Sequence, residues 1–292
     1  AVILAIVTTW STLLSTPRNL EPMAFYEILF WGGGHVLQFA NTAAMLALWL
    51  FLVEQISGQP VLKRGTANLL FGLMILPCLV APLIPLQDPT SGFYRLFFTR
   101  LMQWGIFPVT LMILARCLFV LVRSKQVQWR SLAAFGWLCS VGLTLTGFVL
   151  GALIRGSNTL VPAHYHANIG AVTVTYMTVG LMLLWQANWS VRKQNWARFQ
   201  PLIFGLGQTV FALGFALAGA HGMSRKVYGA EQHIRTTAEY VGLTVMGLGG
   251  LLAIIGGILF LGLTLRPMWQ QFRPQPISKT NLGSSHLIEE EI

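Results

Sequence analysis

Residues 25–53 read FYEILFWGGGHVLQFANTAAMLALWLFLV, and Glu27 is the sole charged side chain in this run. An α-helix of that length exceeds the roughly 30 Å hydrocarbon core of a bilayer, because each residue adds about 1.5 Å. The stretch therefore predicts a transmembrane helix that carries a histidine, His35, within it.

Apolar runs of comparable length recur along almost the whole chain. The mean hydropathy is +0.64 and 10% of the residues are charged, whereas about a quarter are charged in soluble domains. We predict an all-α fold, a polytopic transmembrane helix bundle of about seven to eight spans over residues 1–273, in contact with membrane lipid, and a polar C-terminal tail at 274–292. Further spans are expected at 67–86, 96–122, 132–154, 163–187, 200–220 and 238–264, with a shorter one at 1–15.

The N-terminal segment AVILAIVTTWSTLLS does not have the features of a signal peptide. It has no initiating methionine, no basic n-region and no small-residue cleavage site. The segment resembles a clipped first helix, so we expect the C-terminal part of a longer protein or one half of a split subunit.

The net charge of +10 is compatible with nucleic-acid binding, but the basic residues are scattered between the spans and form no stripe. No nucleic-acid partner is expected. Basic residues are denser in every second connection, and the positive-inside rule assigns those connections to the cytoplasm. The four basic clusters are Lys63 and Arg64; Arg123, Lys125 and Arg130; Arg192, Lys193 and Arg198; and Arg266, Arg273 and Lys279.

The segment Pro162-Ala-His164-Tyr-His166-Ala-Asn-Ile-Gly170 places two histidines at the outer end of a span. Residues two apart on an α-helix point about 200° away from each other. His164 and His166 therefore cannot clasp one metal on a regular helix, but each can offer an axial ligand to a different haem iron. Alternatively, one or both hydrogen-bond to neighbouring helices or to interfacial water.

The segment Phe30-Trp-Gly-Gly-Gly-His35 is the second candidate. Glycines inside a transmembrane helix permit the close approach of another helix or leave room for a bulky ligand. The adjacent histidine favours the ligand; a packing notch beside one hydrogen-bonded histidine is the alternative. Glu27 is either proton-linked or interfacial, and we favour the interfacial role.

The third candidate, Ala220-His221-Gly-Met-Ser-Arg225-Lys226, lies in an outward-facing connection. Adjacent Arg225 and Lys226 can neutralise carboxylates, including haem propionates, through charge-assisted hydrogen bonds. A solvated basic turn is the alternative. Binding of propionates by this turn is favoured because the turn and the histidine pair are expected on the same membrane face.

Taken in order, these motifs resemble the catalytic subunit of the haem-copper oxidase and nitric oxide reductase superfamily. The likeness runs over nearly the whole chain and is to the second half of that twelve-helix subunit. The segment 31–35 is similar to the WxxGH-type segment of the family's helix six, and 164–166 to the H-F-H motif of helix ten. The segment 222–226 resembles the G-M-P-R-R turn, and Pro108 falls where helix eight carries a proline.

The resemblance implies two haems, with His164 as the proximal ligand of a high-spin haem and His166 as an axial ligand of a low-spin haem. Arg225 and Lys226 would bind propionates, and His35 would lie on the distal, catalytic side. The second low-spin ligand belongs to the family's helix two, which is absent here, so it must come from missing sequence or a partner subunit. A quinol or cytochrome c would donate electrons, in a bacterial-type inner membrane.

Departures from the family pattern bear on the metal site and on proton transfer. The family's paired histidines should fall near Leu83 and Ile84, but no histidine occurs between His35 and His164. Because copper needs several nitrogen or sulfur ligands, we expect no copper site. Proton pumping through the family's usual routes is not expected either, because its proton-path positions are occupied by Leu37, Phe39 and Met112.

The sequence leaves three functions open. The first is a subunit of a respiratory oxidoreductase, similar to a terminal oxidase or nitric oxide reductase, that carries electrons to a high-spin haem, with His35 and Gln38 one helical turn apart on the distal side. The second is a degenerate oxidase-like subunit that relays electrons to, or scaffolds, a partner complex without oxygen chemistry. The third is a transporter without a cofactor, although the chain shows no internal repeat.

Overall fold

The computed structural model describes residues 1–187, 196–227 and 233–271. Their regular structure is helical, and seven helices are long and apolar enough to cross a membrane. The predicted all-α, multi-pass membrane bundle is therefore confirmed. The elements are α1 (Val2–Ser15), α2 (Pro22–Ser57), α3 (Arg64–Ile75), η1 (Leu76–Leu86), α4 (Gly92–Gly105), α5 (Phe107–Arg123), α6 (Leu132–Leu153), α7 (Leu160–Gln186), η3 (Ala197–Phe199), α8 (Gln200–Ala220) and α9 (Thr237–Gln271).

Each expected span coincides with a helix or a joined pair, but two spans have internal breaks that were not predicted. The span expected at 96–122 consists of α4 and α5, which meet at Ile106 just before Pro108. The span expected at 67–86 is α3 continued by the 3₁₀ helix η1, whose prolines remove amide donors. The tail predicted at 274–292 lies outside the described residues.

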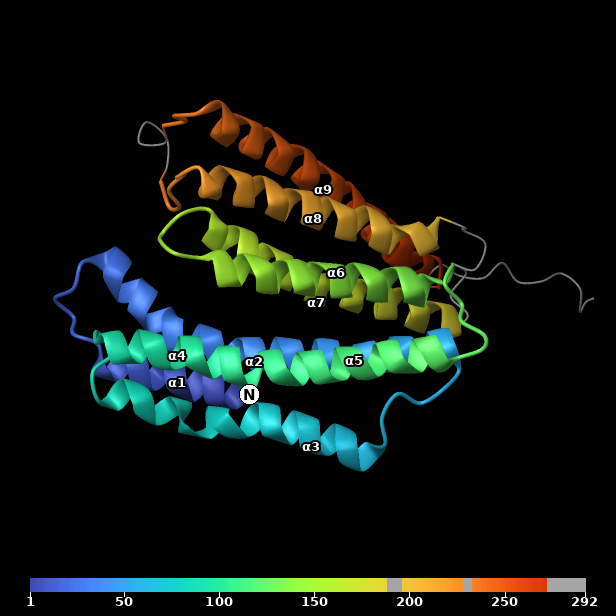
Figure 1. Ribbon diagram of the computed structural model, residues 1–292, viewed down its shortest axis with the longest axis horizontal. Helices are drawn as coiled ribbons and strands as arrows, with labels where there is room; N and C mark the ends of the chain where they lie inside the picture. The colour runs from blue at the N-terminus through green and yellow to red at the C-terminus, as the bar shows by residue number, and fades with distance from the viewer. Residues whose placement is uncertain (188–195, 228–232, 272–292) are drawn as a thin grey trace, which may run out of the picture.

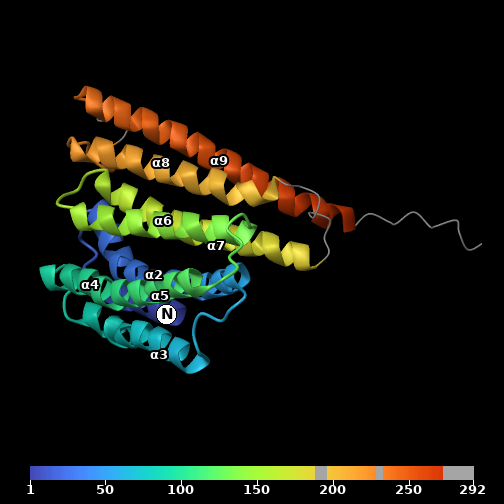
Figure 2. The same cartoon turned by 45° about the vertical axis from the view of Figure 1, so that its right-hand side comes forward.

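The helices lie side by side as roughly parallel and antiparallel segments (Figure 1). Helix α3 lies at one edge, α2 is central and α9 lies at the opposite edge, next to α8. Helix α2 packs against α1, α4, α5, α6 and α7. Figure 2 shows the same order from a second direction.

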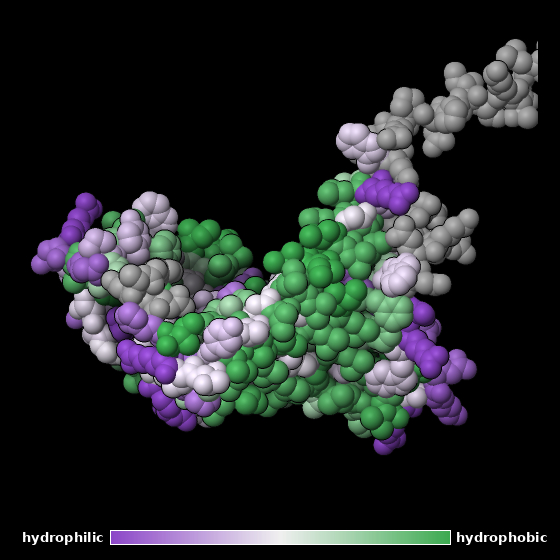
Figure 3. Space-filling model, turned by 90° about the horizontal axis from the view of Figure 1, so that it is seen from above, coloured by the Kyte–Doolittle hydropathy of each residue, from purple (hydrophilic) through white to green (hydrophobic). Residues whose placement is uncertain are grey.

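Successive connections lie at alternating ends of the bundle (Figure 1). The α5–α6 connection meets the end of α2, since the Gln128 amide donates to the Ile56 carbonyl at 3.0 Å. The opposite end holds the α8–α9 connection, in which Lys226 contacts Glu27 of α2. Figure 3 shows apolar surface between two hydrophilic ends, as expected for a protein in contact with lipid.

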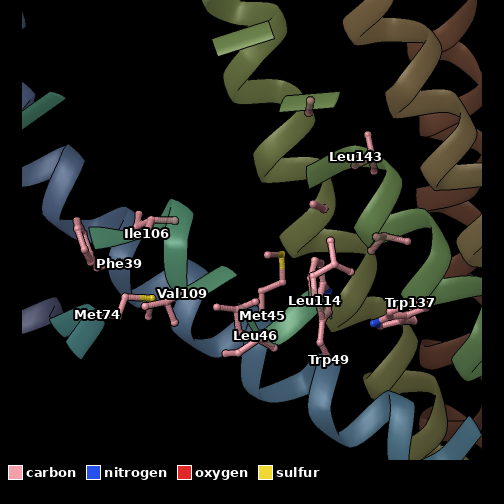
Figure 4. Packing of buried hydrophobic residues seen from close by; sticks show 14 of the residues in the cluster. Phe39, Met45, Leu46, Trp49, Met74, Ile106, Val109, Leu114, Trp137 and Leu143 are labelled. Atoms are coloured by element: carbon pink, nitrogen blue, oxygen red, sulfur yellow. The ribbon is translucent and has the colours of Figure 1, made fainter. Parts of the chain in front are cut away.

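The core contains polar groups that are paired within the protein. The indole Nε1 of Trp49 donates to the Ser140 hydroxyl at 2.8 Å, and that hydroxyl donates to the Ala171 carbonyl at 2.9 Å. These contacts tie α2 to α6 and α6 to α7. Around them, apolar side chains of α2, α5 and α6 converge, including Trp49, Leu114 and Trp137 (Figure 4). The bundle thus keeps these polar groups away from lipid.

Helices α8 and α9 approach closely along glycines. A Cβ at Gly214 would meet the backbone of α9, and a Cβ at Gly249 would meet the backbone nitrogen of Phe211. Small residues let transmembrane helices pack backbone to backbone, where van der Waals contact supplies most of the attraction. The close packing of α8 against α9 at these glycines therefore stabilises the pair of helices.

We expect Gly249→Ala to lower the free energy of unfolding by about 1–3 kcal/mol, because the added methyl group would force α8 and α9 apart. Gly247→Ala, on the same helix, is the matched control, since nothing lies within 4 Å of its Cβ position. Thermal unfolding in detergent measures both variants. Equal loss of stability in the two variants would show that the close approach is not what holds this pair.

Candidate functional site

His164 lies near the start of α7 (Leu160–Gln186) and is anchored to α6. Its Nδ1 is 2.6 Å from the Gly147 carbonyl oxygen. A carbonyl can only accept, so Nδ1 carries a proton, and in the neutral ring Nε2 keeps a free lone pair. Histidines that ligate metals usually donate their other ring nitrogen to a carbonyl or carboxylate in this way.

Two glycines on α6 make room for this arrangement. A Cβ at Gly151 would lie 2.7 Å from Cε1 and Nδ1 of His164, and a Cβ at Gly147 would collide with the Asn168 side chain. The Asn168 amide donates to the His164 carbonyl at 3.1 Å and lies 3.3 Å from its Nδ1. The two glycines of α6 therefore leave room for the His164 ring and the Asn168 side chain.

His166 faces a different neighbour. Its half-buried ring packs edge-on to Phe211 at 4.9 Å between centroids and is stacked with Phe215 at 6.0 Å, both on α8. No hydrogen bond joins the ring to another described residue. The predicted divergence is confirmed, because His164 contacts α6 while His166 contacts α8. The hydrogen-bonded alternative holds for Nδ1 of His164.

His35 is oriented by its own helix and by α4. Its Nδ1 donates to the Trp31 carbonyl at 2.6 Å, which again leaves Nε2 free in the neutral ring. The ring lies 4.6 Å from the Trp31 indole and 6.4 Å from the Phe98 ring. The indole Nε1 of Trp31 is buried without a hydrogen-bond partner among the described residues. Gln38 is engaged elsewhere, because its oxygen accepts from Asn41 at 3.4 Å.

The glycine run before His35 serves packing more than ligand space. A Cβ at Gly32 would lie 2.7 Å from the Tyr94 hydroxyl, and a Cβ at Gly33 would collide with Thr9 of α1. Only Gly34 has open space around its Cβ position among the described atoms. The ligand interpretation that the sequence favoured is thus wrong for Gly32 and Gly33, which admit α4 and α1.

The basic turn forms an ion cluster with α2 and α4. Lys226 Nζ lies 2.8 Å from Glu27, and Arg225 and Arg95 each lie 4.0 Å from the same carboxylate. Arg225 Nε also donates to Ser157 at 2.9 Å. The Glu27 side chain is 25% exposed at this end of the bundle, and its interfacial role stays a prediction. The cluster carries two more positive charges than negative ones, so it can accept further carboxylates.

Backbone contacts join the basic turn to the start of α7. The Thr159 amide donates to the Met223 carbonyl at 3.0 Å, and Asn158 pairs with Ser224. The histidine pair and the basic turn therefore lie at the same end of the bundle, as expected. His35 is on α2, which packs against α7. The described residues bring together no group of three or more His, Cys, Asp or Glu side chains that could hold a metal ion.

Sequence reasoning missed Gly147, Gly151, Asn168 and Tyr94. The two glycines form a small-xxx-small pair, a pattern that signals a helix contact in membranes. That pattern could have predicted a close α6–α7 contact. Asn168 lies one turn after His164, which places it on the same helix face. Nothing in the sequence singles out Tyr94.

Comparisons with known proteins find two relatives, both described as uncharacterized proteins. The chain is 26% identical to an uncharacterized protein of Rickettsia prowazekii (strain Madrid E), an alignment that covers 82% of the chain and 54% of the relative. It is 29% identical to an uncharacterized protein of Aquifex aeolicus (strain VF5), covering 64% of the chain and 46% of the relative. No family model and no solved structure matches. The chain spans about half the length of these relatives.

Proposed function

We propose that this multi-pass membrane protein is a haem-binding subunit of a respiratory oxidoreductase, related to terminal oxidases and nitric oxide reductases, that carries electrons to a high-spin haem. The observation that carries the proposal is the His164 ring. Its Nδ1 is held by a backbone carbonyl at 2.6 Å, and glycine at position 151 accommodates the imidazole. These are the features of an axial ligand fixed in tautomer and orientation.

The other residues fit a second haem and its carboxylates. His166 points to the opposite flank of α7, between aromatic rings of α8, and has no competing hydrogen bond among the described residues. Arg225, Lys226 and Arg95 retain excess positive charge after pairing with Glu27. That excess matches the two propionates of one of the two haems, which the basic pair would hold at the outer membrane surface. Copper is not part of the proposal.

Haem iron would supply one-electron redox chemistry at this site. The chain would supply axial nitrogens from His164 and His166, and cations that compensate the carboxylates. His35 would present its free Nε2 from α2, and the buried Trp31 Nε1 beside it would offer one more donor. Any second axial ligand of the low-spin haem would come from a partner subunit or additional sequence.

Electron relay without oxygen chemistry is the second candidate, and one observation favours it. The positions where the family carries paired histidines are Leu83 and Ile84, in the 3₁₀ helix η1, and Leu83 is 61% exposed. These two positions offer apolar side chains and no ligand for a second metal. In that case the haems would pass electrons from a quinol or cytochrome c to a partner complex.

A bacterial inner membrane is the proposed location, since both relatives come from bacteria. The whole protein's substrate, electron donor and partner subunits are part of the same proposal. A cofactor-free transporter remains the alternative that iron analysis would reveal.

We expect His164→Ala to remove one haem and His166→Ala to remove the other, because each substitution removes the imidazole nitrogen that would bind the iron. Haem is counted by pyridine haemochrome in protein purified with its copurifying subunits. His221→Ala is the matched control, since that exposed histidine bonds to the Leu217 carbonyl of its own helix. Unchanged haem content in both α7 variants would refute the ligand assignment.

Carbon monoxide distinguishes catalysis from relay. A reduced high-spin haem with an exchangeable sixth position should bind carbon monoxide, so we expect carbon monoxide to shift the absorption spectrum. We also expect His35→Leu to change this shifted spectrum, because His35 would lie on the distal side. A haem spectrum that does not change with carbon monoxide would favour relay and contradict a reaction with dioxygen or nitric oxide.

A further inference from the structure

We propose that Tyr94 is a positioning residue that sets the orientation of His35 by inserting its hydroxyl into the backbone of α2. The proposal rests on the function proposed above, in which His35 lies on the distal side of a haem. It concerns a residue on α4 that the sequence motifs do not include.

The Tyr94 hydroxyl bridges two backbone groups of α2. The Gly32 N–H donates to it at 3.0 Å, and it donates to the Ile28 carbonyl at 3.0 Å. Those two groups are four residues apart, the pair that a regular α-helix joins directly. A side chain inserted into the i→i−4 ladder is a recognised cause of helix bending. Figure 1 shows α2 changing direction near its N-terminal end, beside α4.

The bridged turn contains the residue that orients His35. Trp31 lies between Ile28 and Gly32, and its carbonyl accepts from His35 Nδ1 at 2.6 Å. The same indole packs against the imidazole at 4.6 Å between centroids. Any change in the turn therefore moves both contacts of the ring, and with them the direction of Nε2.

The position of the Tyr94 hydroxyl is fixed by contacts with three neighbouring residues. Tyr94 is fully buried, and the Thr12 hydroxyl of α1 lies 3.2 Å from its oxygen. The absence of a side chain at Gly32 is required, because a Cβ there would lie 2.7 Å from that oxygen. Phe98, one turn after Tyr94, packs on the same glycine and lies 6.4 Å from the His35 ring. A buried hydroxyl with this many partners is held in one orientation.

Neighbouring Arg95 shows that this part of α4 grips the same face of α2. Its guanidinium lies 6.0 Å from the centre of the Trp31 ring and 4.0 Å from Glu27. Arg95 thus contacts α2 within the bridged turn and immediately before it. Tyr94 differs from its neighbours because its hydroxyl contacts both a backbone N–H and a backbone carbonyl of α2.

The test uses the full chain in lipid bilayers with ¹⁵N-labelled histidine rings, and reads each ring by NMR. His35 is assigned with His35→Gln. Tyr94→Phe keeps the aromatic ring and removes the bridge, and we expect the His35 signal to shift more than that of any other histidine. Tyr176→Phe, which removes an exposed hydroxyl on α7, should leave His35 unchanged.

A second variant keeps the experiment decisive if Tyr94→Phe does not fold. Thr12→Val preserves shape and removes one partner of the Tyr94 hydroxyl, so a smaller His35 shift is expected. An unshifted His35 signal in the folded variants overturns the positioning role. Haem content is measured on the same samples. If the His35 signal shifts in protein that contains no haem, the proposed function is refuted and the positioning role stands. If the His35 signal does not shift in protein that contains haem, the positioning role is refuted and the proposed function stands.

Discussion

The bilayer offers no water to buried polar groups, so a partner within the protein stabilises such a group. Ser140 shows how this constraint organises the bundle, because its hydroxyl joins the Trp49 indole to the Ala171 carbonyl and so links three helices. The Tyr94 hydroxyl meets the same demand in a different way, by pairing with two backbone groups of α2. Glu27 satisfies it at the surface with three cations.

The same constraint bears on the histidine ring nitrogens that form no hydrogen bond with the described residues. His35 and His164 each use Nδ1 to reach a carbonyl, and each neutral ring then presents Nε2 without a proton. His166 packs among aromatic rings with no described hydrogen-bond partner. Polar side chains at membrane depth are expensive to keep, which makes functional use the natural hypothesis. Haem ligation would use His164 and His166, with the basic turn at the same end of the bundle and His35 on the distal side.

Hydropathy and helical geometry were enough to predict the spans and the divergence of His164 and His166. Both depend on local properties, namely the length of an apolar run and the angle between successive residues. The role of the glycine run was not predictable in the same way. Gly32 and Gly33 have meaning only through Tyr94 and Thr9, which lie far away in the sequence. Likewise, the break at Ile106 and the 3₁₀ helix η1 reflect local prolines within runs that hydropathy alone reads as continuous.

Iron and haem content of the purified full chain, with its copurifying subunits, tests the central claim most directly. The proposed function predicts iron in a haem group, visible in a reduced-minus-oxidised spectrum as the bands of a cytochrome. A preparation that retains its helical fold but contains no iron and shows no such bands would contradict haem binding. In that case the free histidine nitrogens of α2 and α7 would need a different explanation, such as a transporter or a scaffold without a cofactor.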